Sequence, residues 1–146
     1  MSGPRDYQRS RVYAWENRVV APRDNSFVAF AEAQGMVNAI WAEMGLLYPP
    51  KVEPLPKQAK ATVACANRLA IYLPARTPSW CLFHEVSHAM TSTVDGHSDG
   101  HGKSFVGIYV KLLARFLRFD AAELTLSLQG ERIEIDNAAN PIFMNG

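Results

Sequence analysis

Cysteine is scarce in this chain, and long apolar segments are absent. The 146 residues include only two cysteines, Cys65 and Cys81, too few for the disulfide framework of a small secreted protein. No run of about 18 apolar residues occurs, so we predict no membrane-spanning helix. The first residues also lack the apolar core of a secretory signal. These absences favour a cytoplasmic protein that has no membrane partner.

Charge of one sign is not in excess either. The formal net charge is +1, which by itself indicates neither a nucleic-acid nor a membrane partner. We find no internal repeat and no low-complexity segment. The hydrophobic fraction of 48% is typical of globular proteins, and the length suffices for one buried core. We therefore predict a single domain over residues 1–146, in which residues 137–146 form a loosely held tail.

The chain does contain an H-E-x-x-H motif, from His84 to His88, inside an apolar segment. This segment predicts a helix that has Thr77 as its N-cap and ends near Thr91. Residues four apart lie on the same face of a helix, so both imidazoles can bind one metal ion. Glu85 points about 100° away from His84. There, beside the metal, a carboxylate can take a proton from a bound water.

A third metal ligand must come from outside the motif, because a catalytic zinc ion usually has three protein ligands. The polar, glycine-rich loop that follows supplies four candidates: Asp95, His97, Asp99 and His101. We favour His101, because it lies between two glycines and directly precedes a predicted helix that can hold it rigidly. His97 is the second choice. The two aspartates are alternative ligands, or they orient a ligand histidine.

The remaining segments predict an α+β protein, in which a small mixed or antiparallel sheet packs on the motif helix and on two or three further helices. Ser26 is the expected N-cap of the longest helix in the first half, and Gly45 its C-terminal stop. Helical periodicity or caps occur in residues 4–19, 26–44, 103–117 and 120–128. Extended structure is expected for residues 48–56 at a sheet edge, for a hairpin of 61–65 and 68–73, and for 132–135.

Two further features have both a functional and a structural interpretation. A hydrolase needs a hydrogen-bond donor for the substrate oxygen, and Tyr72 and Tyr109 are candidates, although core packing explains Tyr109 more simply. The N-terminal arginines and a basic ridge could contact phosphates, but a solvated surface is the simpler explanation of both. Nucleic acid is thus an alternative partner and not the expected one. The ridge consists of Lys111, Arg115 and Arg118.

Three stretches of the chain resemble a family of metal-dependent enzymes. They read R-D-x-Q-R-x-R-V-Y-A over residues 5–14, L-F-H-E-x-x-H-A over residues 82–89, and H-G-x-x-F over residues 101–105. Together they resemble small, uncharacterised bacterial and phage metallohydrolases of the H-E-x-x-H type. More distantly, the metal-binding part is similar to the core of SprT-like metallopeptidases. The resemblance implies a zincin-like fold.

The resemblance also implies an activity and a metal site. It makes His84, His88 and His101 ligands of one zinc ion per chain, and Glu85 the catalytic base of a hydrolase that acts on a peptide or protein. The chain departs from the family at residues 103–104, which read Lys-Ser where the family often has Pro-Glu. It also has no C-x-x-C pair of the SprT-like zinc ribbon, so DNA-dependent proteolysis does not carry over.

A non-catalytic binding module stabilised by zinc is the alternative to the enzyme. Structural zinc sites are closed by four protein ligands and need no base. An intact Glu85 argues against this alternative. It becomes the better interpretation if His97 and His101 both bind the metal and close the site.

Overall fold

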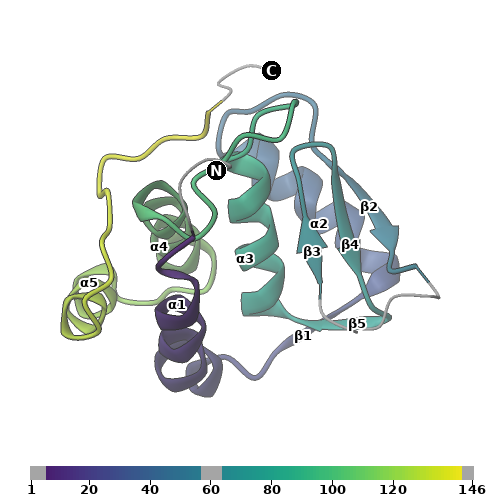
Figure 1. Ribbon diagram of the computed structural model, residues 1–146. Coiled ribbons are helices and arrows are strands. Elements are labelled where there is room, and N and C mark those ends of the chain that lie inside the picture. The colour runs from purple at the N-terminus through teal and green to yellow at the C-terminus, as the bar shows by residue number, and fades with distance from the viewer. Residues whose placement is uncertain (1–5, 57–63, 143–146) are drawn as a thin grey trace.

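Helix α3 (Ser79–Met90) lies in the middle of the fold, between a small sheet on one side and other helices on the opposite side (Figure 1). The computed structural model describes residues 6–56 and 64–142. Helix α2 lies behind the sheet, whereas α1, α4 and α5 lie across α3 from it (Figure 1). The protein is therefore α+β, as predicted. The five α-helices of the described part are α1 (Arg9–Trp15), α2 (Phe30–Glu43), α3 (Ser79–Met90), α4 (Lys103–Phe116) and α5 (Ala121–Gly130).

The strands are short and form two sheets. In the three-stranded sheet the order is β2-β4-β3, with β2 parallel and β3 antiparallel to β4. The proline-rich segment thus forms an edge strand, and β3 and β4 form the expected hairpin, of which residues 61–63 lie outside the described residues. Strands β1 and β5 form an antiparallel pair beneath α3. The strands are β1 (Phe27–Ala29), β2 (Lys51–Pro54), β3 (Cys65–Ala66), β4 (Ala70–Leu73) and β5 (Arg76–Pro78).

Both predicted N-caps before α2 and α3 are wrong, and the β1–β5 pair is the reason. Val28 pairs with Thr77 in this two-stranded sheet, and both are buried. The pairing takes the residues after Ser26 out of the helix, so α2 begins at Phe30. It likewise moves the start of α3 to Ser79. Tertiary pairing here overrides local helix signals. The predicted ends hold, because α2 stops before Gly45, and α3 ends at Met90 with Thr91 as its C-cap.

The first helix changes its geometry along its length. Helix α1 continues directly as a π-helix, Glu16–Val20, and then as a 3₁₀ turn, Ala21–Arg23. π-helical turns are rare and often occur at functional sites. Val12, Trp15 and Val20 are fully buried, so this segment is anchored in the core on both sides of Glu16.

The predicted strand at residues 132–135 does not form. The side chain of Gln8 occupies the backbone groups that a neighbouring strand would need: its Oε1 accepts from the N–H of Glu134 at 2.6 Å, and its Nε2 donates to the carbonyl at 3.3 Å. The start of the expected tail, 137–142, packs on the helices. Ala139 is buried, and Ile142 N–H donates to the carbonyl of Met90 at 2.9 Å. Residues 143–146 lie outside the described residues.

The core lies where α3 and α4 meet the sheet and α1. The largest fully buried side chains include Trp15, Trp41, Phe105, Tyr109, Leu82 and Ile71.

Helix α5 begins with the cap expected from the sequence, because the Asp120 carboxylate accepts from Ala122 N–H at 2.9 Å and from Glu123 N–H at 3.1 Å. Within residues 6–56 and 64–142, no helix combines the length and the apolar character that crossing a membrane requires.

Candidate metal centre

Three imidazoles converge between α3 and the start of α4. His84 and His88 lie one turn apart on α3, and His101 comes from the end of the glycine-rich loop. The Nε2 of His101 lies 3.2 Å from that of His88 and 3.3 Å from that of His84. Ligand atoms that all lie within 4.8 Å of one another could hold one metal ion. In the described part of the chain, this is the only cluster of three or more such side chains that could hold one.

Glu16 orients the first of these imidazoles. Its Oε2 lies 2.5 Å from the Nδ1 of His84, and both residues are buried. Tyr109, on α4, donates its hydroxyl to the same oxygen at 2.6 Å. Because a carboxylate accepts hydrogen bonds, this contact places the His84 proton on Nδ1 and leaves Nε2 free to bind a metal. Sequence analysis missed Glu16, since nothing local distinguishes it from the other polar residues of its helix.

Asp6 orients the third imidazole in the same way. Its Oδ2 lies 2.7 Å from the Nδ1 of His101, and its Oδ1 accepts the backbone N–H of His101 at 2.9 Å. Gln8 donates to the carbonyl of His101 at 2.9 Å. The N-terminal stretch that carries part of the family resemblance therefore holds a ligand in place. A carboxylate behind an imidazole is a common support in zinc sites.

Aromatic rings fill the space around the imidazoles. The ring of Phe105 lies 5.0 Å from His84, 4.4 Å from His88 and 5.0 Å from His101, centroid to centroid. The ring of Tyr13 stacks on His84 at 5.9 Å, with an interplanar angle of 11°, and meets His101 edge-on at 5.0 Å. Packing of this kind restricts each imidazole to one rotamer, so the donor set is organised in advance.

The imidazoles differ in how readily they take a proton. Burial lowers the pKa of His88 well below its ordinary value, and the neighbouring His84 and His101 lower it further. Burial also lowers the pKa of His101, although the hydrogen bond that the imidazole donates to Asp6 acts in the opposite direction. At His84 the hydrogen bond and charge of Glu16 outweigh burial, so its pKa is raised. A metal ion therefore finds two imidazoles in the neutral form that binds it and competes with a proton at the third.

Glu85 lies beside this cluster and is almost completely buried, with 5% of its surface exposed. Burial raises the pKa of its carboxyl to about 7, and Glu16 adds to the rise while His84 opposes it. A carboxyl that titrates near neutral pH can both take and return a proton, which is what general acid–base catalysis requires. Glu85 is thus a buried carboxyl next to the histidine cluster that could exchange a proton near neutral pH.

A cavity of about 400 Å³ adjoins Glu85 between α1 and α3. Helix α1 contributes Arg9 and Tyr13, and its π-helical continuation contributes Asn17. The remaining lining residues are Glu16, Ala64, Trp80, Cys81 and Glu85. We call this cavity the α1–α3 cleft. Both polar groups and aromatic side chains line it, as is usual for small-molecule and substrate sites, and it lies beside the histidine cluster.

The other ligands considered from sequence lie elsewhere. His97 is exposed and lies 3.1 Å from the carboxylate of Asp95, which also accepts the Thr93 hydroxyl. Asp99 stabilises the start of α4, where its Oδ2 accepts the N–H of Ser104 at 2.8 Å. None of the three belongs to the histidine cluster. Among the described residues, the cluster therefore consists of three candidate ligands and has no fourth.

Neither tyrosine considered as an oxyanion donor lines the α1–α3 cleft. Tyr109 is fully buried, and its hydroxyl is bound to Glu16. Burial and Glu16 raise its pKa well above the ordinary value. Tyr72 lies on β4, paired with Cys65 of β3.

The basic residues that could contact phosphates mostly have partners within the chain. Arg11 donates to the carbonyl of Arg132 at 2.7 Å, and Arg18 pairs with Glu131. On the ridge, Lys111 donates to the carbonyl of Ala139. Arg115 pairs with Glu43 at 2.9 Å. These contacts support the structural interpretation of both basic surfaces.

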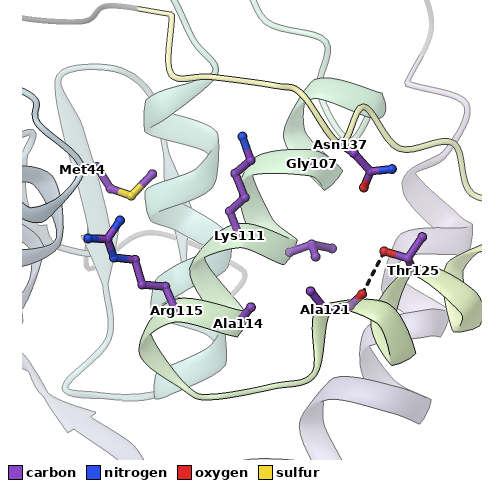
Figure 2. A pocket seen from close by; sticks show the side chains of 9 residues that line it. Met44, Gly107, Lys111, Ala114, Arg115, Ala121, Thr125 and Asn137 are labelled. Atoms are coloured by element: carbon purple, nitrogen blue, oxygen red, sulfur yellow. Dashed lines mark hydrogen bonds between the residues drawn. The ribbon is translucent and has the colours of Figure 1, made fainter.

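A second cavity, of about 460 Å³, lies away from the cluster, against α4, α5 and the C-terminal segment. Figure 2 shows Lys111 and Arg115 on one side of it and Thr125 and Asn137 on the other. The Thr125 hydroxyl donates to the carbonyl of Ala121 within α5 at 2.9 Å. Neither cavity is lined by a histidine of the cluster, but the α1–α3 cleft is lined by Glu85 and by Glu16, which contacts His84, whereas this cavity is lined by neither. It is larger than the α1–α3 cleft, but no histidine, cysteine or carboxylate lines it.

Comparison of the chain with known proteins identified no matching family model, no matching curated protein and no matching solved structure.

Proposed function

We propose that this protein is a zinc-dependent hydrolase with a zincin-like fold, and that it cleaves peptide bonds in a peptide or protein substrate. The observation that carries the proposal is the convergence of three imidazole Nε2 atoms beside Glu85 and the α1–α3 cleft. His84, His88 and His101 would hold one zinc ion per chain. Three nitrogen ligands with a further position open are the donor set of catalytic zinc.

The donor set fits zinc in its chemistry as well as in its number. Two of the imidazoles have their Nδ1 atoms fixed by carboxylates, Glu16 and Asp6, so their Nε2 atoms are available to a metal. His84 and His101 are buried, His88 is half-buried, and aromatic rings pack around all three, which keeps the imidazoles in one geometry. Zinc bound there supplies Lewis acidity, which lowers the pKa of a bound water and polarises a substrate carbonyl.

The chain's own residues account for the proton transfers of hydrolysis. Glu85 takes a proton from the attacking water as the water oxygen bonds to the carbonyl carbon. It then gives this proton to the leaving nitrogen as the C–N bond breaks. Water is consumed and no oxidant or reductant is needed. In the metal-free protein, burial raises the pKa of Glu85 to about 7.

Zinc content and hydrolysis test the proposal in two steps. The first compares wild type with His101→Ala and His97→Ala by elemental analysis after zinc has been supplied and the excess removed. We expect about one zinc ion per chain in wild type and in His97→Ala, and a large loss in His101→Ala. A wild-type protein that holds no zinc would overturn the proposal.

The second step asks whether the zinc site is catalytic. Wild type and Glu85→Gln, both loaded with zinc, are incubated with a fluorogenic peptide library. Glu85→Gln should keep its zinc and lose hydrolysis, because the amide cannot take the proton. If zinc-loaded wild type cleaves no peptide, a zinc-stabilised binding module is the better description of the protein.

A further inference from the structure

Tyr13 covers the metal-binding cluster from the side of α1. Its ring is nearly parallel to that of His84, with an angle of 11° and centroids 5.9 Å apart, and it meets His101 edge-on at 5.0 Å. The guanidinium of Arg9 lies over the same ring, 5.6 Å from its centroid. Tyr13 therefore packs against two of the three candidate ligands, His84 and His101.

The hydroxyl of Tyr13 has no partner within the described residues, unlike those of Tyr7 and Tyr109, which donate to Glu134 and Glu16. The residue is 39% exposed, although its ring packs against the imidazoles. It also lines the α1–α3 cleft together with Glu85. A tyrosine that lines a cleft, and whose hydroxyl has no partner inside the protein, can donate a hydrogen bond to a ligand there.

Tyr13 and Glu85 line the same cleft from different helices. Arg9, Tyr13 and Asn17 follow one another at intervals of four residues along α1 and its continuation, and all three line the cleft. Glu85 lines it from α3. A carbonyl group in the cleft would therefore lie between Glu85 on α3 and Tyr13 on α1.

We propose that Tyr13 is a catalytic residue of the hydrolase: its hydroxyl donates a hydrogen bond to the substrate carbonyl oxygen as water attacks and that oxygen becomes negatively charged. This inference rests on the proposed function. Tyr13 keeps its proton throughout, so the balance of the reaction remains that of hydrolysis. A preorganised donor of this kind stabilises the transition state far more than the bound substrate.

The test compares zinc-loaded wild type with Tyr13→Phe, and with Tyr72→Phe as a matched control outside the cleft. The phenylalanine keeps the ring that packs on His84, so zinc content should not change. The probes are three phosphinic dipeptide analogues, with alanine, phenylalanine and lysine side chains, in which a tetrahedral, negatively charged phosphinate replaces the scissile amide. Their affinities are measured by calorimetry, alongside kcat and KM for any peptide that wild type cleaves.

We expect Tyr13→Phe to bind the best phosphinate at least 10-fold more weakly than wild type, and to lower kcat by about 100-fold with little change in KM. Tyr72→Phe should behave like wild type in every measurement. Equal phosphinate affinity in Tyr13→Phe and wild type would overturn the role of Tyr13 and leave the proposed function standing. If zinc-loaded wild type binds none of the phosphinates and cleaves no peptide, the proposed function fails, and the role of Tyr13 fails with it.

Discussion

Glu16 lies 2.5 Å from the Nδ1 of His84, although 68 residues separate the two in the sequence. The same oxygen also accepts the hydroxyl of Tyr109, from α4, at 2.6 Å. One buried carboxylate thus connects α1, α3 and α4 at the candidate metal centre. The contact sets the tautomer of His84 and holds its ring in place.

Replacing Glu16 should weaken zinc binding without removing a ligand. In Glu16→Gln the acceptor loses its charge, so the His84 imidazole becomes a poorer donor to the metal. We expect the affinity for zinc to fall by roughly 10–100-fold, the usual effect of losing such a support. Competition with a chromogenic chelator measures the change. Glu43→Gln, which alters only an exposed ion pair with Arg115, is the control and should keep wild-type affinity.

The second carboxylate can be displaced without mutating it. A Cβ added at Gly100 would lie 2.7 Å from the Cγ of Asp6, the residue that holds His101. Gly100→Ala should therefore push Asp6 away from His101 and lower zinc affinity by about 10-fold. Gly96→Ala is the matched control. Both glycines have positive φ, +64° and +93°, but a Cβ at Gly96 meets nothing within 4 Å. Equal zinc affinities in the two variants would contradict this role of Asp6.

The packing of α4 gives a matched pair for stability. A Cβ at Gly107 would lie 2.0 Å from the carbonyl oxygen of Asp136, so α4 and the C-terminal segment would have to separate. Gly107→Ala should lower the melting temperature by many degrees. Gly35 is exposed in α2 and a Cβ there has open space, so Gly35→Ala should stabilise the fold by about 0.5–1 kcal/mol. Thermal unfolding, monitored by circular dichroism, measures both changes in stability. A Gly107→Ala variant as stable as wild type would show that the segment at Asp136 can move away from α4 at no cost.

The sequence allows the local part of the site to be predicted, because helical spacing depends on nearby residues alone. His84 and His88 lie on one face of α3, and His101 directly precedes α4, as expected from the motif and the glycine-rich loop. The structure brings the three together. Asp6 and Glu16 could not be foreseen in this way, because each meets its histidine only through the packing of α1 against α3 and α4.

The same distinction explains the errors in secondary structure. Local signals predict that Phe27–Ala29 starts a helix, but this segment pairs with Arg76–Pro78, which lies about a third of the chain length away. Residues 132–135 have a strand-like alternation, but the Gln8 side chain takes the hydrogen bonds of Glu134. In each case a contact between distant segments determines the backbone, and local propensity does not report such contacts.

The carboxyl of Glu85 should make the metal-free protein less stable as the pH rises. Its pKa is raised to about 7 in the folded state, against an ordinary value of 4.5, because the folded protein buries it. The folded state therefore holds this proton more tightly than the unfolded state does. The stability that the protonated carboxyl contributes is fully present below pH 4.5 and is lost as the pH rises through 7.

Glu85→Gln removes this titration, so its effect on stability should depend on pH. With zinc removed by a chelator, we expect the variant to match wild type near pH 4.5 and to be more stable at pH 8, by up to about 3 kcal/mol. Urea unfolding at the two pH values measures the difference, and Glu43→Gln corrects for the general effect of losing a carboxylate. A gain that is equal at both pH values would mean that Glu85 is not held in its protonated form by burial. A gain confined to high pH would show that the carboxyl next to the histidine cluster lowers stability when it is ionised. A residue retained for proton transfer is expected to behave in this way.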